Sequence, residues 1–128
     1  MNEGSSTSGV ISTGTISFED FKHENGITYW WASEFMTMLG YSDLKSFRKV
    51  IDRTTSALIS LGIKHHEQII FEKRVVGGNE VEDYKLTRFA CYLMAMNGDP
   101  KKPEVAKAQA FFVEQTRAFQ LMLEGAKD

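Results

Sequence analysis

The sequence predicts a small α+β domain made of two β-hairpins, each followed by two helices. Two turn signals, Asn25-Gly26 and Gly77-Gly78-Asn79, each separate short runs rich in β-branched and aromatic residues, as hairpin turns do. Each hairpin is followed by segments in which apolar residues recur at helical spacing. With 128 residues the chain has room for one hydrophobic core. The order of elements contains no βαβ unit, so a parallel sheet is not expected.

The first hairpin is expected to begin near Ile16, with strands ISFEDFK and ITYWWA on either side of the Asn25-Gly26 turn. Neighbouring strand residues face opposite ways, so one of Trp30 and Trp31 is expected in the core. The other is then partly exposed and a candidate for stacking on a nucleic-acid base. A short helix follows, ended by Gly40; its residues with helical spacing are Phe35, Met38 and Leu39.

The second helix is the clearest periodic segment of the chain. Ser42 is the expected N-cap, Asp43 lies in the first turn, where the helix dipole favours negative charge, and Gly62 ends the helix. Its expected apolar stripe is Leu44, Phe47, Ile51, Leu58 and Leu61.

The second hairpin joins IIFEKRVV to EVEDYKL, and Thr87 then opens a helix that runs through Met96. Asn97-Gly98 ends this helix, and Asp99-Pro100 prevents its continuation because a residue before proline avoids the α region. Its expected core residues are Phe89, Leu93 and Met96. Six motif residues are expected to be structural and mainly to fix the turn between the last two helices; they are Arg88, Tyr92, Asn97, Gly98, Asp99 and Pro100.

Pro103 and Glu104 suit the first turn of a final helix. Its expected buried stripe is Val105, Ala108, Phe112, Thr116, Phe119 and Leu123. Phe111, Leu121 and Met122 add apolar residues on other faces of this helix. Such a helix favours burial against a second subunit, in a homodimer, or against a missing C-terminal domain.

Composition is that of a soluble globular protein, with 42% hydrophobic and 25% charged residues. A single cysteine, Cys91, and the lack of a secretory signal favour a reducing, cytoplasmic setting. No apolar run approaches the roughly 20 residues that cross a bilayer, so no membrane partner is expected. Residues 1–15, rich in Ser, Thr and Gly, are interpreted as a flexible leader, and residues 16–128 as the domain.

Positive charge is concentrated in the middle of a chain whose net charge is -2. Seven cations are the candidate nucleic-acid-binding residues: Lys45, Arg48, Lys49, Arg53, Lys64, Lys73 and Arg74. From Tyr41 to Arg74 these seven cations face only four acids, Asp43, Asp52, Glu67 and Glu72. One face of the protein could therefore approach DNA phosphates. The alternative is an ordinary solvated face, on which Lys49 makes only the usual helical i,i+3 or i,i+4 pairs, with Asp52 or Arg53.

Other chemistry has little support in the sequence. Adjacent His65 and His66 lack the spacing of metal ligands, so no metal and no cofactor is expected. Cys91 lies in an apolar helix, where a thiol is poorly reactive. Glu80, Glu82 and Asp83 do not complete a metal-dependent nuclease site, and a solvated edge strand explains them better. No catalytic residue is assigned.

Two blocks, YWWASEFMTMLGYSD and DYKLTRFACYLMAMNGDPKKPEVAKAQAFFVEQTR, resemble the Bro-N family, whose members include phage antirepressors and baculovirus repeated-ORF proteins. Its bacterial DNA-damage-inducible members are the most similar, and the likeness covers roughly residues 18 to 120. The resemblance implies a DNA-binding or regulatory module of phages and mobile elements, or of the bacterial SOS response, without established catalytic residues. Such modules are commonly fused to a variable C-terminal domain, whereas this sequence stops soon after its last helix.

The residues and the resemblance together predict a non-catalytic, DNA-binding regulatory module that contacts the phosphate backbone. The alternative is a protein-interaction module, of antirepressor or RecA-filament antagonist type, whose partner is a repressor or a recombinase. The two hypotheses differ in salt dependence, because only phosphate contacts make affinity fall steeply with added salt.

Overall fold

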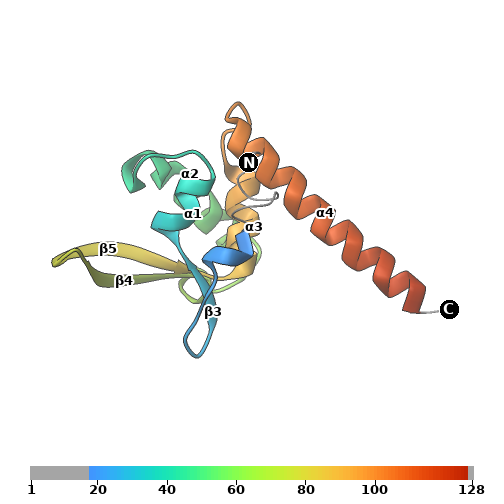
Figure 1. Cartoon of the computed structure of the whole chain (residues 1–128), viewed down its shortest axis with the longest axis horizontal. Helices are drawn as coiled ribbons and strands as arrows, with labels where there is room; N and C mark the ends of the chain where they lie inside the picture. Colours follow the sequence, from blue (N-terminus) through green and yellow to red (C-terminus); the bar gives the residue numbers. More distant parts are fainter. Residues whose placement is uncertain (1–17, 127–128) are drawn as a thin grey trace, which may run out of the picture.

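The computed structural model describes residues 18–126 and is an α+β domain (Figure 1). The predicted leader lies outside the described residues. In chain order the elements are the 3-10 turn η1 (Phe18–Phe21), β2 (His23–Glu24), β3 (Thr28–Trp31), α1 (Ala32–Met38), α2 (Leu44–Ser60), the 3-10 turn η2 (His65–Glu67), β4 (Ile69–Val76), β5 (Asn79–Leu86), α3 (Arg88–Asn97) and α4 (Pro103–Ala126). The predicted fold class is confirmed. In this part of the chain, no helix is long and apolar enough to cross a bilayer.

The two predicted hairpins join into one antiparallel sheet with strand order β2-β3-β5-β4. β3 and β5 pair at Trp30 with Leu86 and at Trp31 with Lys85. β4 and β5 form a long hairpin that projects away from the helices (Figure 1). Gly77 and Gly78 make its turn at φ +59° and +83°, the left-handed region that glycine adopts readily.

The predicted first strand, ISFEDFK, is wrong for its described residues, none of which lies in a strand. Only His23 and Glu24 pair with β3, while Phe18–Phe21 form the turn η1. The Phe18 ring stacks on Trp30 with centroids 4.2 Å apart, and Trp30 Nε1 donates to the Phe18 carbonyl oxygen at 2.9 Å. Packing of Phe18 in the core therefore explains why these residues form a turn and not the strand that the alternating pattern predicted.

Asp43, not the predicted Ser42, is the N-cap of α2, and its carboxylate accepts from the Ser46 amide at 2.7 Å. This hydrogen bond holds the pKa of Asp43 below its usual value. The observed buried face of α2 is Phe47, Val50, Ile51, Thr54 and Leu58. The predicted Leu61 is 61% exposed, because the helix has already ended at this C-cap position.

The predicted core face of α3 is wrong for two of its three residues. Phe89 and Met96 are 41% and 46% exposed, and Leu93 is only partly buried. The buried residues are Ala90, Cys91, Met94 and Ala95. α3 packs against both α2 and α4, and small side chains on its buried face let neighbouring helices approach closely. The prediction chose the large apolar side chains as core residues. The narrow space between the helices instead selects the smaller ones for burial.

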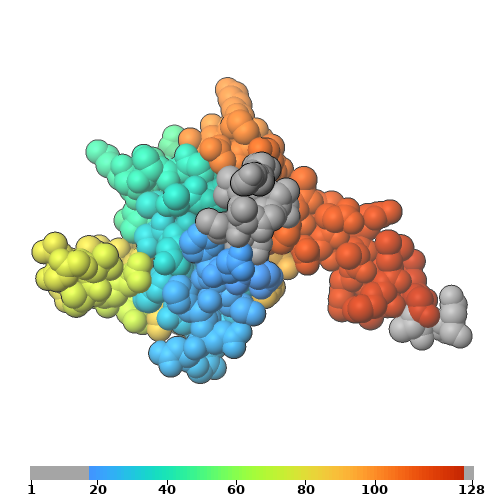
Figure 2. All heavy atoms as spheres, in the orientation of Figure 1, coloured from blue at the N-terminus to red at the C-terminus, as the bar shows by residue number. Residues whose placement is uncertain are grey.

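α4 packs on the domain only through its first half. Val105, Ala108 and Phe112 are buried as predicted, and the helix then leaves the body of the molecule (Figure 1). The predicted burial of Thr116, Phe119 and Leu123 is wrong within this chain, where all three side chains are exposed. Figure 2 shows that half as an arm separate from the body.

Candidate nucleic-acid interface

The outward face of α2 carries cations on successive turns. Lys45, Lys49 and Arg53 lie opposite the buried stripe and are exposed. The acid Asp52 lies on the same side of the helix, so the face is basic without being uniformly charged.

A hollow of about 410 Å³ lies where this face meets the turn between α3 and α4. Its lining includes three cations, Lys49, Arg53 and Lys102, and one acid, Asp99. Arg53 Nη1 donates to the Asn97 carbonyl oxygen at 3.3 Å, and Lys102 Nζ donates to the Gly40 carbonyl oxygen at 3.1 Å. Because carbonyl oxygens leave both cations with their formal charge, the hollow has a net positive lining suited to an anion.

The turn that supplies Lys102 is held by hydrogen bonds from several elements. The Asp99 amide donates to the Tyr41 hydroxyl at 3.0 Å, and the Asp99 carboxylate accepts from the Lys101 amide at 3.0 Å. Asn97 Nδ2 donates to the Leu93 carbonyl oxygen at 2.9 Å, which anchors the end of α3. These contacts fix the turn in which Lys102 lines the hollow beside α2 and Lys101 is exposed next to it in the chain. We call this set of five cations the basic face: Lys45, Lys49, Arg53, Lys101 and Lys102.

Gly98 makes this turn possible through its size. Its φ of -74° is ordinary, but an added Cβ would lie 3.0 Å from both methyl groups of Val105. The close approach brings the start of α4 against the end of α3. Glycine therefore avoids a tight contact with Val105 here, and its role is to leave space and not to give backbone freedom.

The remaining predicted cations do not join the basic face. Arg48 Nη1 donates to the Tyr84 hydroxyl at 3.0 Å, on the side of the β4–β5 hairpin. Lys73 lies directly opposite Glu82 across that hairpin. Lys64 is exposed beyond the C-terminal end of α2. The seven cations that are near one another in sequence are thus spread over several surfaces.

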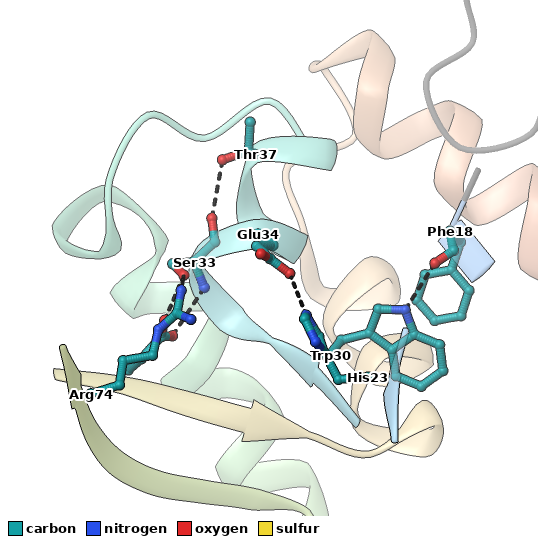
Figure 3. A network of polar contacts seen from close by, with 8 residues as sticks. Phe18, His23, Trp30, Ser33, Glu34, Thr37 and Arg74 are labelled. Atoms are coloured by element: carbon teal, nitrogen blue, oxygen red, sulfur yellow. Dashed lines mark hydrogen bonds and ion pairs between the residues drawn. The ribbon is translucent and has the colours of Figure 1, made fainter. Parts of the chain in front are cut away.

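Arg74 is held in a structural network between the β4–β5 hairpin and the start of α1 (Figure 3). Its Nε donates to the Asp83 carboxylate at 3.1 Å, and its guanidinium lies 4.2 Å from the centroid of the Trp31 ring. Asp83 is 1% exposed and also accepts from the Ser33 amide at 3.1 Å and the Ser33 hydroxyl at 2.5 Å. A buried carboxylate requires such partners, so this arginine stabilises the fold.

Both tryptophans are buried, which corrects the prediction that one is exposed. Trp30 is fully buried against Phe18, and Trp31 is 7% exposed. Trp31 lies on the opposite face of the sheet, where Tyr29, His23 and Arg74 cover it. Neither ring is free to stack on a base.

The motif pattern predicted that Arg88 helps to fix the turn between the last two helices, but its contacts lie elsewhere. Its guanidinium donates to both carboxylate oxygens of Glu19, at 2.6 and 3.1 Å, and lies 4.9 Å from the centroid of the Trp30 ring. The pairing lowers the pKa of Glu19 and raises the pKa of Arg88. Arg88 therefore ties α3 to η1. Tyr92 packs on Phe112 with ring centroids 4.4 Å apart and so joins α3 to α4.

The acidic and histidine side chains of the described residues do not cluster around a common point. No group of three or more His, Cys, Asp or Glu side chains there is arranged to hold a metal ion. His65 and His66 lie in the turn η2, and His23 lies within 3.0 Å of the Glu34 carboxylate (Figure 3). Glu80 and Glu82 are exposed on the hairpin, directly opposite Val75 and Lys73.

Cys91 is expected to be unreactive in the folded protein. The side chain is fully buried, and this burial raises the pKa of its thiol well above the usual value. The thiolate is the nucleophile that attacks a disulfide reagent and displaces its aromatic thiolate, so native protein should react orders of magnitude more slowly than protein unfolded in urea. Release of a chromophore from an aromatic disulfide reagent measures both rates. Equal rates in the two states would contradict the burial.

The comparisons with known proteins identify a family for this chain. Residues 20–116 match the family described as "BRO family, N-terminal domain". The chain is 37% identical over 111 residues to DNA damage-inducible protein D of Escherichia coli strain K12, covering 81% of this chain and 40% of that protein. The chain thus spans less than half of that relative's length. No solved structure matches. The family match over residues 20–116 and this sequence identity show that the chain belongs to the BRO family and carries its N-terminal domain.

Proposed function

We propose that this domain is a non-catalytic regulatory module that binds the phosphate backbone of DNA through the basic face. The observation that carries the proposal is the hollow lined by Lys49, Arg53 and Lys102. Three cations from two elements distant in sequence converge on it, although the chain as a whole is acidic. Local concentration of positive charge on a protein of net charge -2 favours electrostatic binding of a polyanion at one surface.

The similarity to DNA damage-inducible protein D supports a regulatory role in the response to DNA damage. Lysine and arginine contacts to phosphate position a protein on DNA without reading its sequence. The basic face has this character, because it is rich in cations and its aromatic neighbour Tyr41 is buried. Binding is therefore expected to depend little on base sequence.

Replacing Lys45 and Lys49 together by alanine is expected to weaken DNA binding uniformly across sequences. Each phosphate contact contributes about one unit to the slope of log affinity against log salt concentration, so the slope should fall in magnitude by about 2. Fluorescence anisotropy with labelled single- and double-stranded DNA over a range of salt concentrations measures this slope. Both lysines are exposed, so the substitutions should leave the fold intact.

The matched control is Lys64→Ala with Lys107→Ala, which removes the same charge from two exposed positions outside the basic face. This control should retain the slope of the wild-type protein. Equal losses in the two double variants would show that only net charge matters and would contradict the basic face. Absence of binding by the wild type at low salt would contradict DNA binding itself. The protein-interaction hypothesis, with a repressor or recombinase as partner, would then remain.

A further inference from the structure

Two Asn-Gly pairs in the described part of the chain have opposite surroundings. Asn25 and Gly26 lie in the turn between β2 and β3, which projects from the body, and both residues are exposed (Figure 1). Asn97 is the last residue of α3, and the Gly98 that follows it is buried. The same dipeptide is therefore surrounded by solvent at one position and by packed protein at the other.

An asparagine that precedes glycine can lose its side-chain amide to its own backbone. The backbone nitrogen of the glycine gives its proton to a base in the solvent and attacks Cγ of the asparagine. The bond from this nitrogen to Cγ forms, the bond from Cγ to Nδ2 breaks, and Nδ2 takes up a proton and leaves as ammonia. Water then opens the resulting cyclic imide to aspartate or isoaspartate. Glycine favours the attack because it has no Cβ to restrict the backbone.

Hydrogen bonds oppose this reaction at Asn97. Its Nδ2 donates to the Leu93 carbonyl oxygen at 2.9 Å, and the Gly98 amide donates to the Ala95 carbonyl oxygen at 3.3 Å. Arg53 Nη1 also donates to the Asn97 carbonyl oxygen at 3.3 Å. The attacking nitrogen and the leaving amide are thus both held at the end of α3, and ring closure requires these contacts to break.

The turn at Asn25 lacks such restraints. Its hydrogen bond runs from the Asn25 amide to the Ile27 carbonyl oxygen at 3.1 Å. Within the part of the chain that the structure describes, neither the Asn25 side chain nor the Gly26 amide has a hydrogen-bond partner. Gly26 has a φ of +83°, and an added Cβ there would meet nothing within 4 Å. The backbone of this turn therefore has the space that ring closure needs.

We propose that Asn25 is a deamidation site of the native protein, with water as the co-reactant, and that the fold protects Asn97. The product carries a carboxylate in place of a neutral amide, beside the exposed Glu24. Isoaspartate also adds a backbone carbon to the turn, because the chain then runs through the former side chain. β2 pairs with β3 only through His23 and Glu24, so deamidation loosens this pairing.

Incubation of the native chain in warm, mildly alkaline buffer, followed by proteolysis and mass spectrometry, measures deamidation at both positions. Asn25 should deamidate at least about 10-fold faster than Asn97, because two hydrogen bonds of Asn97 and Gly98 must break before Asn97 reacts. In urea both pairs lose their surroundings, so the ratio of the two rates should fall toward one. Equal rates in the native protein, or a ratio that urea leaves unchanged, would overturn the proposal.

Asn25→Gln is the matched control, because it keeps an exposed amide but would have to close a larger and less favourable ring. This variant should keep the fold by circular dichroism and show no loss of amide at position 25 over the same incubation. Amide hydrogen exchange should be faster in β2 of the deamidated wild type than in Asn25→Gln after the same treatment. Equal exchange in the two proteins would overturn the proposed loosening of β2.

Discussion

Asp83→Ala is expected to lower the free energy of unfolding by about 3 kcal/mol, because removing one partner of a buried ion pair leaves the other uncompensated. The carboxylate of Asp83 is 1% exposed and binds both the Ser33 amide and the Arg74 guanidinium. Without it, the guanidinium loses its counterion and the amide at the start of α1 loses its acceptor. Both losses act on the junction between the sheet and α1 (Figure 3).

Urea denaturation followed by far-ultraviolet circular dichroism measures this loss. The matched control is Glu72→Ala on the neighbouring strand, where the carboxylate is 43% exposed and pairs with Lys85 at 3.3 Å. Exposed ion pairs contribute about 1 kcal/mol or less, so this control should remain close to the wild type. Combining Asp83→Ala with Arg74→Ala should cost less than the sum of the two single losses, because both remove the same interaction. Equal costs for Asp83→Ala and Glu72→Ala would contradict the network.

Elements that depend on local chemistry were predictable from the sequence. The Asn25-Gly26 and Gly77-Gly78 turns close hairpins in the structure, and three glycines of these turns adopt positive φ. Thr87 caps α3 as predicted, with its hydroxyl accepting from the Ala90 amide at 3.1 Å. Turn and cap residues act on backbone groups within a few positions, so a single sequence contains the necessary information.

Features that depend on tertiary pairing were missed. Nothing local indicates that β3 pairs with β5, so neither the single sheet nor the burial of both tryptophans followed from the pattern. Asp83 was interpreted as part of a solvated acidic strand. The Gly77-Gly78 turn does contain a usable signal, because it sets a register that puts Asp83 and Arg74 on one face of the hairpin.

The candidate site shows the same division. Lys45, Lys49 and Arg53 were found because helical spacing places them on one face. Lys101 and Lys102 were missed because they lie far along the sequence from α2, and Lys102 comes to the hollow beside this helix only through the turn that Asp99 and Tyr41 hold. Arg74 was included because counting charge along a sequence does not reveal a buried counterion. The basic face is therefore a tertiary feature, of which the sequence discloses one half.

Trp30→Ala is expected to be the most destabilising single substitution, at about 3–5 kcal/mol, the range for removing a large buried aromatic side chain. Trp30 is fully buried, stacks on Phe18 and lies beneath the guanidinium of Arg88. Its loss leaves a cavity at the contact between η1, β3 and α3. Thermal and urea unfolding of the variant measure the change.

Trp30→Phe separates packing from hydrogen bonding at this position. Phenylalanine keeps an aromatic ring against Phe18 but leaves the Phe18 carbonyl oxygen without its 2.9 Å partner, Nε1 of the indole. An unsatisfied buried acceptor costs about 1–3 kcal/mol, so this variant should lie between the wild type and Trp30→Ala. DNA affinity of the folded Trp30→Phe protein should equal that of the wild type, because the ring contacts no solvent. If Trp30→Phe kept its stability and lost DNA binding, that result would contradict the core role of Trp30 and support stacking of its ring on a base.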